Sequence, residues 1–316
     1  MNNSSVITTF TLSGLHGIAN YRVTLFVLTL LCYCVIWLVN VTIIVTIVLD
    51  KTIHEPMYIF LCNLCINGLY GTTGFYPKFL IDLLSTTHVI SFAGCLLQGF
   101  VLHSSLCADV SILVLMAYDR YVAICQPLVY HSVMTTQRVC VCLFFAWVIP
   151  HYLVFVGSIT TARLRLCGSH IPKLYCVNFW VGKLACTPSI ASVIVPAFNY
   201  TFYFFHIVFI VWSYVCLIKT CMTSKENWSK FMQTCLPHLI CLIIFFISLG
   251  FDLMYMRFGS EVSQHVQNFM AIEFLLVPPA INPLIYGFKL TQIRKRVIQC
   301  LCGKHLGQGH KFCVKG

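Results

Sequence analysis

The chain has 316 residues, of which 59% are hydrophobic and only 9% are charged, and it carries a formal net charge of +11. A mean hydropathy of +0.86 excludes a soluble globular protein, because a core of this size cannot enclose so many apolar side chains. The positive charge does not indicate nucleic-acid binding, since the basic residues follow the ends of apolar segments and no soluble module accompanies them. The composition therefore predicts a protein that crosses a membrane several times.

Seven apolar segments are long enough to cross the hydrocarbon layer as helices, which takes roughly 20 residues each. In chain order they cover residues 21–49, 57–84, 95–124, 139–159, 189–222, 231–255 and 266–288. We therefore expect an all-α fold, with a bundle of seven transmembrane helices over residues 21–288. An exposed tail over residues 1–20 precedes it, and a short amphipathic helix and tail over residues 289–316 follow it.

An odd number of spans places the two ends of the chain on opposite sides of the membrane. Thirteen of the twenty lysines and arginines, from Lys51 and Arg120 to the C-terminal tail, share one side, which the positive-inside rule makes cytosolic. We expect a plasma-membrane protein with an extracellular N-terminus, glycosylated at Asn2 or Asn3 in overlapping acceptor patterns. No basic region with a short apolar core precedes the first span, so that span is expected to act as the anchor.

The third span contains ionisable residues, which are costly in a membrane and functional by default. Asp109 lies inside the span and requires a cation, a proton or a polar partner. At its end, Met116-Ala117-Tyr118-Asp119-Arg120-Tyr121 includes an acid next to a base. This pair predicts a switch between resting and active states. The alternative is that it only anchors the helix at the interface.

Four cysteines lie on the expected extracellular side, namely Cys95, Cys167, Cys176 and Cys186. Four cysteines allow three pairings, and an oxidising compartment favours two bonds. Most of the remaining cysteines lie inside spans, where a thiol is a small apolar packing group.

Four further motifs mark the ends of spans. Pro56-Met57-Tyr58 begins the second, Ser213-Tyr214 ends the fifth, Thr234-Cys235-Leu236-Pro237-His238 opens the sixth and Pro278-Pro279-Ala280-Ile281-Asn282-Pro283-Leu284-Ile285-Tyr286 ends the seventh. A proline inside a helix removes a backbone hydrogen bond and kinks the helix, so the seventh span supplies a bend at which the cytosolic ends of the helices can move.

The basic amphipathic stretch over residues 290–301 is expected to lie on the inner leaflet. Cys300 and Cys302 there are candidates for palmitoylation, and unmodified thiols are the alternative.

Together these motifs resemble the odorant receptors among the rhodopsin-like G-protein-coupled receptors, over nearly the whole chain. The resemblance implies disulfides Cys95–Cys176 and Cys167–Cys186. It also implies that Asp119 restrains Arg120 at rest, and that activation frees Arg120 to meet the G protein. The implied switch consists of Asp119, Arg120, Tyr121, Tyr214, Asn282, Pro283 and Tyr286.

The same family holds a sodium ion between an acid on the second helix and groups on the third and seventh. Here the usual acidic position is Gly68, with Asn67 beside it. Asp109, helped by Asn40, Asn67 and Asn282, is therefore expected either to bind sodium weakly or to be protonated. No other cofactor and no other metal are expected.

The resemblance places the ligand between the outer halves of the third, fifth, sixth and seventh helices. The residues expected to line the site are Leu102, His103, Leu106 and Cys107, Phe198, Asn199, Phe202 and Tyr203, Phe246, Leu249, Gly250 and Leu253, and Asn268 and Ile272. For His103, a structural histidine is the alternative.

Arg257, followed by Phe258-Gly259, resembles the class I, fish-like odorant receptors, and its guanidinium can bind a carboxylate through two parallel bonds. Alternatively, Arg257 reaches lipid headgroups or pairs with Glu261, or Asp252 neutralises it. Glu273 would attract an amine instead of an acid.

The sequence thus predicts an odorant receptor for a small, water-soluble ligand, with a carboxylic acid or amino acid expected first and an amine as the alternative. Its partners would be membrane lipid and the olfactory stimulatory G protein, with cyclic AMP rising downstream. A rhodopsin-like receptor for a non-odorant ligand is the nearest alternative. An integral-membrane enzyme is disfavoured because the twelve histidines are scattered without a catalytic constellation, and a transporter because no internal repeat is visible.

Overall fold

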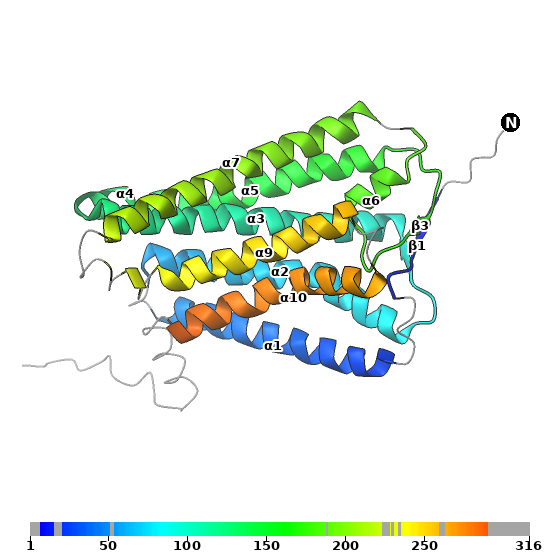
Figure 1. Cartoon of the computed structure of the whole chain (residues 1–316), viewed down its shortest axis with the longest axis horizontal. Coiled ribbons are helices and arrows are strands. Elements are labelled where there is room, and N and C mark those ends of the chain that lie inside the picture. The colour runs from blue at the N-terminus through cyan, green and yellow to red at the C-terminus, as the bar shows by residue number, and fades with distance from the viewer. Residues whose placement is uncertain are drawn as a thin grey trace, which may run out of the picture.

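The computed structural model describes residues 7–15, 21–50, 54–187, 189–222, 228, 231–232, 235–258 and 263–289. Long helices run side by side along the molecule and form a single bundle (Figure 1). The long helices are α1 (Arg22–Leu49), α2 (Pro56–Leu84), α3 (Phe92–Cys125), α5 (Thr136–Ala162), α7 (Ile190–Cys221), α9 (Leu236–Phe258) and α10 (Gln264–Lys289). The expected seven-helix bundle is confirmed. The predicted helix over residues 290–301, with Cys300 and Cys302, and the acceptors Asn2 and Asn3 lie outside the described residues.

Among the described residues, five helices are long and apolar enough to cross a membrane, namely α1, α3, α5, α7 and the part of α10 over residues 268–285. The described part of α9 adds a shorter apolar stretch over residues 239–251. Helix α2 packs against both α1 and α3, so much of its surface faces protein. A helix enclosed in this way needs a less apolar sequence than one surrounded by lipid.

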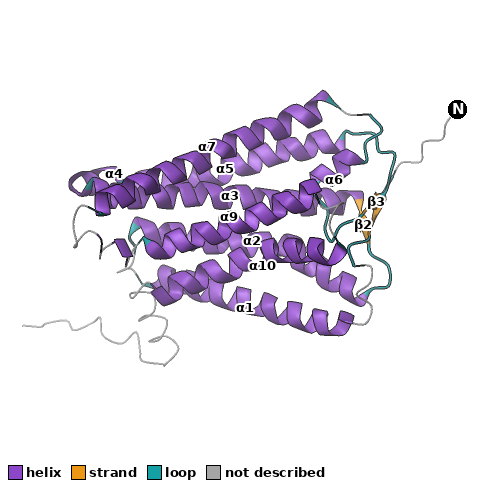
Figure 2. Cartoon of the chain, viewed as in Figure 1, coloured by secondary structure: helices purple, strands orange, loops and turns teal. Residues whose placement is uncertain are grey.

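A small sheet lies at one end of the helical bundle (Figure 2). Strand β1 (Thr9–Leu12) pairs antiparallel with β2 (Val89–Ser91) and parallel with β3 (His170–Ile171). In β1, Phe10 and Leu12 are buried while the two threonines are exposed, the alternation typical of a strand with one covered face. The described part of the N-terminal tail is therefore packed onto the bundle rather than free in solvent.

Two disulfides lie at the same end of the bundle as the sheet, which is called the sheet end below. Cys95 in the first turn of α3 is bonded to Cys176, and Cys167 is bonded to Cys186. Gln98 reinforces the first bond, since its Oε1 accepts from the Cys176 amide at 2.8 Å and its Nε2 donates to the Gly74 carbonyl at 2.9 Å. The connection between α5 and α7, which includes α6 (Asn178–Lys183), is thereby fixed over the bundle.

Candidate functional site

The Asp119–Arg120 pair lies at the other end of the bundle, called the Arg120 end below. Asp119 is completely buried, and its Oδ2 accepts from Arg120 Nε at 2.8 Å and from Arg120 Nη2. Its Oδ1 accepts from the Tyr130 hydroxyl at 2.8 Å. Both carboxylate oxygens are engaged, so Arg120 is held against α3 and is not available to another protein.

Tyr130 is a site residue that the sequence analysis missed. After α3 ends, a short 3-10 helix at Pro127–Val129 turns the chain, and α4 (Tyr130–Val133) brings the phenol back to Asp119. Burial raises the pKa of Tyr130, and the adjacent Asp119 carboxylate raises it further. The hydroxyl therefore remains a hydrogen-bond donor at neutral pH.

If the chain signals as the resemblance implies, replacing Tyr130 with phenylalanine is expected to raise cyclic AMP several-fold without added ligand. The change removes one hydrogen bond to a charged group, worth about 1.5–3 kcal/mol, and leaves Arg120 as the main partner of Asp119. Basal cyclic AMP, normalised to surface receptor, is the measurement. Tyr118→Phe is the matched control, because that ring lies on α3 directly before Asp119 in the chain and contacts Phe209 instead. Equal basal activity in both variants would show that Tyr130 does not restrain the pair.

The other expected switch residues are spread along the bundle. Tyr121 does not join the ion pair; its ring packs against Trp212 of α7 with centroids 5.5 Å apart. Tyr214 is buried on α7, whereas Asn282 and Pro283 line a cavity within the bundle. The side chain of Tyr286 lies outside the described residues.

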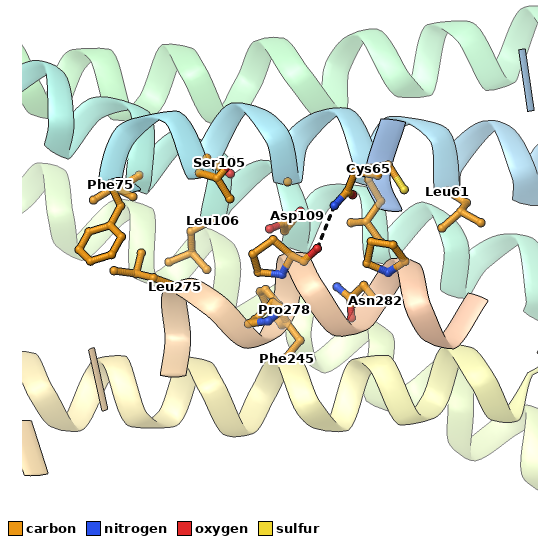
Figure 3. A pocket seen from close by; sticks show the side chains of 18 residues that line it. Leu61, Cys65, Phe75, Ser105, Leu106, Asp109, Phe245, Leu275, Pro278 and Asn282 are labelled. Atoms are coloured by element: carbon orange, nitrogen blue, oxygen red, sulfur yellow. Dashed lines mark hydrogen bonds between the residues drawn. The ribbon is translucent and has the colours of Figure 1, made fainter. Parts of the chain in front are cut away.

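The cavity offers about 60 Å³ of space to water-sized groups. Its walls come from α1, α2, α3, α9 and α10, and Figure 3 shows Asp109 near its middle. Its lining consists of Asn40, Leu61, Leu64, Cys65, Gly68, Gly71, Thr72, Phe75, Leu102, Ser105, Leu106, Asp109, Phe245, Leu275, Pro278, Pro279, Asn282 and Pro283. Gly71 is required by close packing, since a Cβ there would lie 2.3 Å from Ser105 Oγ.

Asparagine side chains connect the cavity to the helices around it. Asn67 Nδ2 donates to Asp109 Oδ1 at 2.7 Å and to the Ser105 carbonyl at 2.8 Å. Asn40 Nδ2 donates to the Pro279 carbonyl at 3.0 Å. That carbonyl lacks its usual helical donor because residue 283 is proline, so Asn40 restores a bond that the bend of α10 removes. The structure thus brings together the four residues expected around a sodium ion.

The residues expected to line the ligand site separate into two groups. Leu106, Tyr203, Phe246 and Leu249 pack on one hydrophobic cluster in the Arg120 half of the bundle, and Ile272 packs on the cluster below the sheet. Of the whole set, only Leu102 and Leu106 line the described cavity. The other lining residues come from α1, α2, α3, α9 and α10, and among them Asn40, Asp109 and Asn282 were expected around a sodium ion and not in the ligand site.

The structure places three of these expected positions away from the described cavity. Phe198 is 59% exposed and Leu253 is 47% exposed, so both lie on the outer surface of the bundle. Asn268 is buried, but its Nδ2 donates to the Gly14 carbonyl at 2.8 Å and holds the N-terminal segment instead of facing a ligand. Arg257 lies in the last turn of α9, and its side chain is outside the described residues.

A cluster of two lysines at the sheet end was not expected. Lys173 is 1% exposed, with its Nζ 4.8 Å from the centroid of the Trp180 ring, and Lys183 Nζ lies 4.4 Å from the same centroid. Burial lowers the pKa of Lys173 to about 8, and the Lys183 ammonium contributes to the lowering. Two lysines and a tryptophan therefore lie together where the α5–α7 connection covers the bundle.

Similarity to known proteins agrees with this arrangement. A family model described as olfactory receptor matches residues 29–304. Olfactory receptor 52B2 of Homo sapiens is 32% identical over 295 residues, covering 91% of this chain and 90% of the relative. Olfactory receptor 5AP2 of Mus musculus is 32% identical over 308 residues, covering 95% of each chain.

The fold is that of rhodopsin. The crystal structure of squid rhodopsin superimposes with a TM-score of 0.74 at 14% identity, covering 90% of this chain and 87% of that chain. The bundle of apolar helices, the motifs at its ends and the match over residues 29–304 agree. This chain therefore belongs to the olfactory receptor family, whose members are membrane receptors and not enzymes.

Proposed function

We propose that the chain is a plasma-membrane odorant receptor that binds a small, water-soluble molecule near its sheet end and activates a stimulatory G protein. Cyclic AMP would rise downstream. The observation that carries this proposal is the buried Asp119, which holds Arg120 at the end of α3 through Nε and Nη2 and leaves Tyr130 as a second donor. Breaking these bonds would present a guanidinium to a partner protein.

The sheet end is proposed to be extracellular. Both disulfides lie there, and disulfides persist in oxidising compartments. The opposite end carries Arg120 and Arg138, in agreement with the positive-inside rule. The N-terminal strand lies at the sheet end, so the proposed glycosylation at Asn2 or Asn3 would be on the oxidising side (Figure 1).

A carboxylic acid or an amino acid is the proposed ligand class, and the class I type is proposed from Arg257 followed by Phe258-Gly259 in the sequence. Support comes from the basic sheet end, where Lys173 and Lys183 flank Trp180, and from Arg257 in the last turn of α9. Clustered positive charge raises the local concentration of anions at the mouth of a site.

Arg257→Ala is expected to raise the effective concentration of an acidic agonist by about tenfold or more, because hydrogen bonds to charged groups contribute about 1.5–3 kcal/mol. A neutral agonist should be nearly unaffected. Cyclic-AMP dose–response curves for an acid and its methyl ester provide the measurement. Arg257→Lys is the matched variant, since it retains the charge but loses the two parallel bonds. Equal losses for acid and ester would assign Arg257 a structural role.

The function as a whole is tested by expressing the receptor with the olfactory stimulatory G protein and screening acids, amino acids and amines for cyclic AMP. Nucleotide-dependent association with the G protein is the second readout, and neither an enzyme nor a transporter would show it. A receptor that reaches the surface and fails both assays with every ligand class would contradict the proposal.

Sodium at Asp109 remains a prediction. The donor set of carboxylate and amide oxygens suits a hard cation. Gly68 leaves only one carboxylate in the cavity lining, which makes retention of a bare ion weaker.

A further inference from the structure

The cavity around Asp109 is chemically divided. Near its middle, Asp109 of α3 and Asn282 of α10 provide oxygen atoms, and Asn40 of α1 also lines the cavity. On the side toward the sheet end the lining includes the apolar side chains of Phe75, Leu102, Leu106 and Leu275 beside the hydroxyl groups of Thr72 and Ser105. Figure 3 shows Phe75 and Leu275 grouped at one end, away from Asp109 and Asn282.

The polar middle of the cavity contains hydrogen-bond acceptors that lack donors. Within the described part of the chain, Asp109 forms no ion pair with a lysine or arginine, and its hydrogen-bond partner is the neutral Asn67 amide. Asn40 is 1% exposed and Asn282 6% exposed, and the Oδ1 atom of each has no hydrogen-bond partner among the described residues. Buried acceptors and a buried carboxylate require donors and positive charge. A cation with N–H groups would supply both the donors and the positive charge.

The size and shape of the cavity indicate more than a metal ion. The cavity offers about 60 Å³ to water-sized groups, whereas a single water needs roughly 10–15 Å³. A bare ion at Asp109 would leave the apolar side unfilled, whereas well-packed interiors contain few such voids. Along α2, Phe75 lies eight residues from Asn67, about 12 Å by helical rise. That length accommodates an alkyl chain of a few carbons.

We propose that this cavity binds a small primary alkylamine in its ammonium form. The ammonium group would pair with Asp109 and donate to the amide oxygens of Asn40 and Asn282, while the alkyl chain would lie against Phe75 and Leu275. This site is separate from the proposed odorant site at Arg257. The cavity also includes Pro278, Pro279 and Pro283, so its occupant would contact the bend of α10.

Direct binding to the purified full-length receptor tests this proposal without any signalling readout. n-Butylammonium chloride is titrated by calorimetry at constant ionic strength, with sodium chloride and sodium butyrate as comparison ligands. Butylammonium is expected to bind, and butyrate is not. From methylammonium to butylammonium, affinity is expected to rise about three- to fourfold per methylene group as each is buried.

Asp109→Asn should lower butylammonium affinity at least tenfold. Glu273→Gln is the matched control, because Glu273 is another carboxylate inside the bundle, bonded to Ser248, that does not line this cavity. Gly68→Val is a second test that retains the charge and fills the space, since a Cβ there would meet Asn40 and Pro279 at an ordinary 3.6 Å. This variant should also lose butylammonium binding.

Three results would overturn the proposal. Binding of sodium as tightly as butylammonium, with no dependence on chain length, would reduce the site to an ion site. Loss of binding in Glu273→Gln but not in Asp109→Asn would place the amine between α9 and α10. Undiminished binding in Gly68→Val would exclude this cavity. Because binding is read without a G protein, a receptor that never raises cyclic AMP can still confirm the amine site.

Discussion

Arg120→Ala is expected to abolish agonist-stimulated cyclic AMP while leaving surface delivery largely intact. In the structure the guanidinium is held by Asp119, and its release would supply the group that meets the G protein. Alanine cannot supply that group in any conformation. Cyclic AMP per surface receptor, with surface level measured by an N-terminal epitope, separates loss of signalling from loss of folding.

A second variant distinguishes loss of signalling from misfolding caused by an unpaired buried charge. Removing Arg120 leaves the completely buried Asp119 carboxylate with Tyr130 as its remaining described partner, and breaking a buried pair costs about 3–5 kcal/mol. The double variant Asp119→Asn with Arg120→Ala removes the stranded charge. The double variant should reach the cell surface at least as well as Arg120→Ala, and it should not raise cyclic AMP in response to agonist. Normal signalling by either variant would refute the assigned role of Arg120.

Cys176→Ser is expected to reduce surface delivery almost completely. The bond to Cys95 closes a loop with a sequence separation of 81, and loss of a native disulfide typically costs about 2–5 kcal/mol. Both cysteines are 0% exposed, so the variant also leaves a polar hydroxyl facing a buried thiol. Surface immunostaining and the yield of monodisperse purified receptor are the measurements.

The control for the disulfide is another cysteine of the same chain. Cys140 is free and exposed on α5, so Cys140→Ser should behave as the unmodified receptor. The double variant Cys95→Ser with Cys176→Ser tests whether the unpaired thiol alone is harmful. Full delivery of the double variant would show that the connection over the bundle is held without the covalent bond.

Functional residues that are neighbours in the chain could be identified from the sequence alone. Asp119 and Arg120 are adjacent in the chain, and an acid and a base at the end of an apolar span indicate a functional pair wherever the helix packs. The expected ligand positions were less accurate. A shift of one residue turns a side chain by about 100° around a helix, enough to move Phe198 and Leu253 from the interior to the outer surface.

The spacing of apolar residues along a helix does not determine how that helix is rotated about its own axis in this protein. Helix α7 exposes apolar residues such as Ile190 and Val193 on its outer face, and its inner face is apolar as well. When both surroundings of a helix are apolar, packing between helices decides which face turns inward. Gly71 illustrates this, because its role becomes visible only when Ser105 of α3 lies against it.

The sequence by itself determined the seven helices, their order and the pairing of Asp119 with Arg120. A helix satisfies its own backbone hydrogen bonds, so length and hydropathy suffice to predict it in a membrane. Only the tertiary structure decided the sheet formed by β1, β2 and β3, the contact of Tyr130 with Asp119 and the cavity at Asp109. Each of these depends on groups far apart in the chain or on the rotation of one helix against another, and no local pattern specifies either.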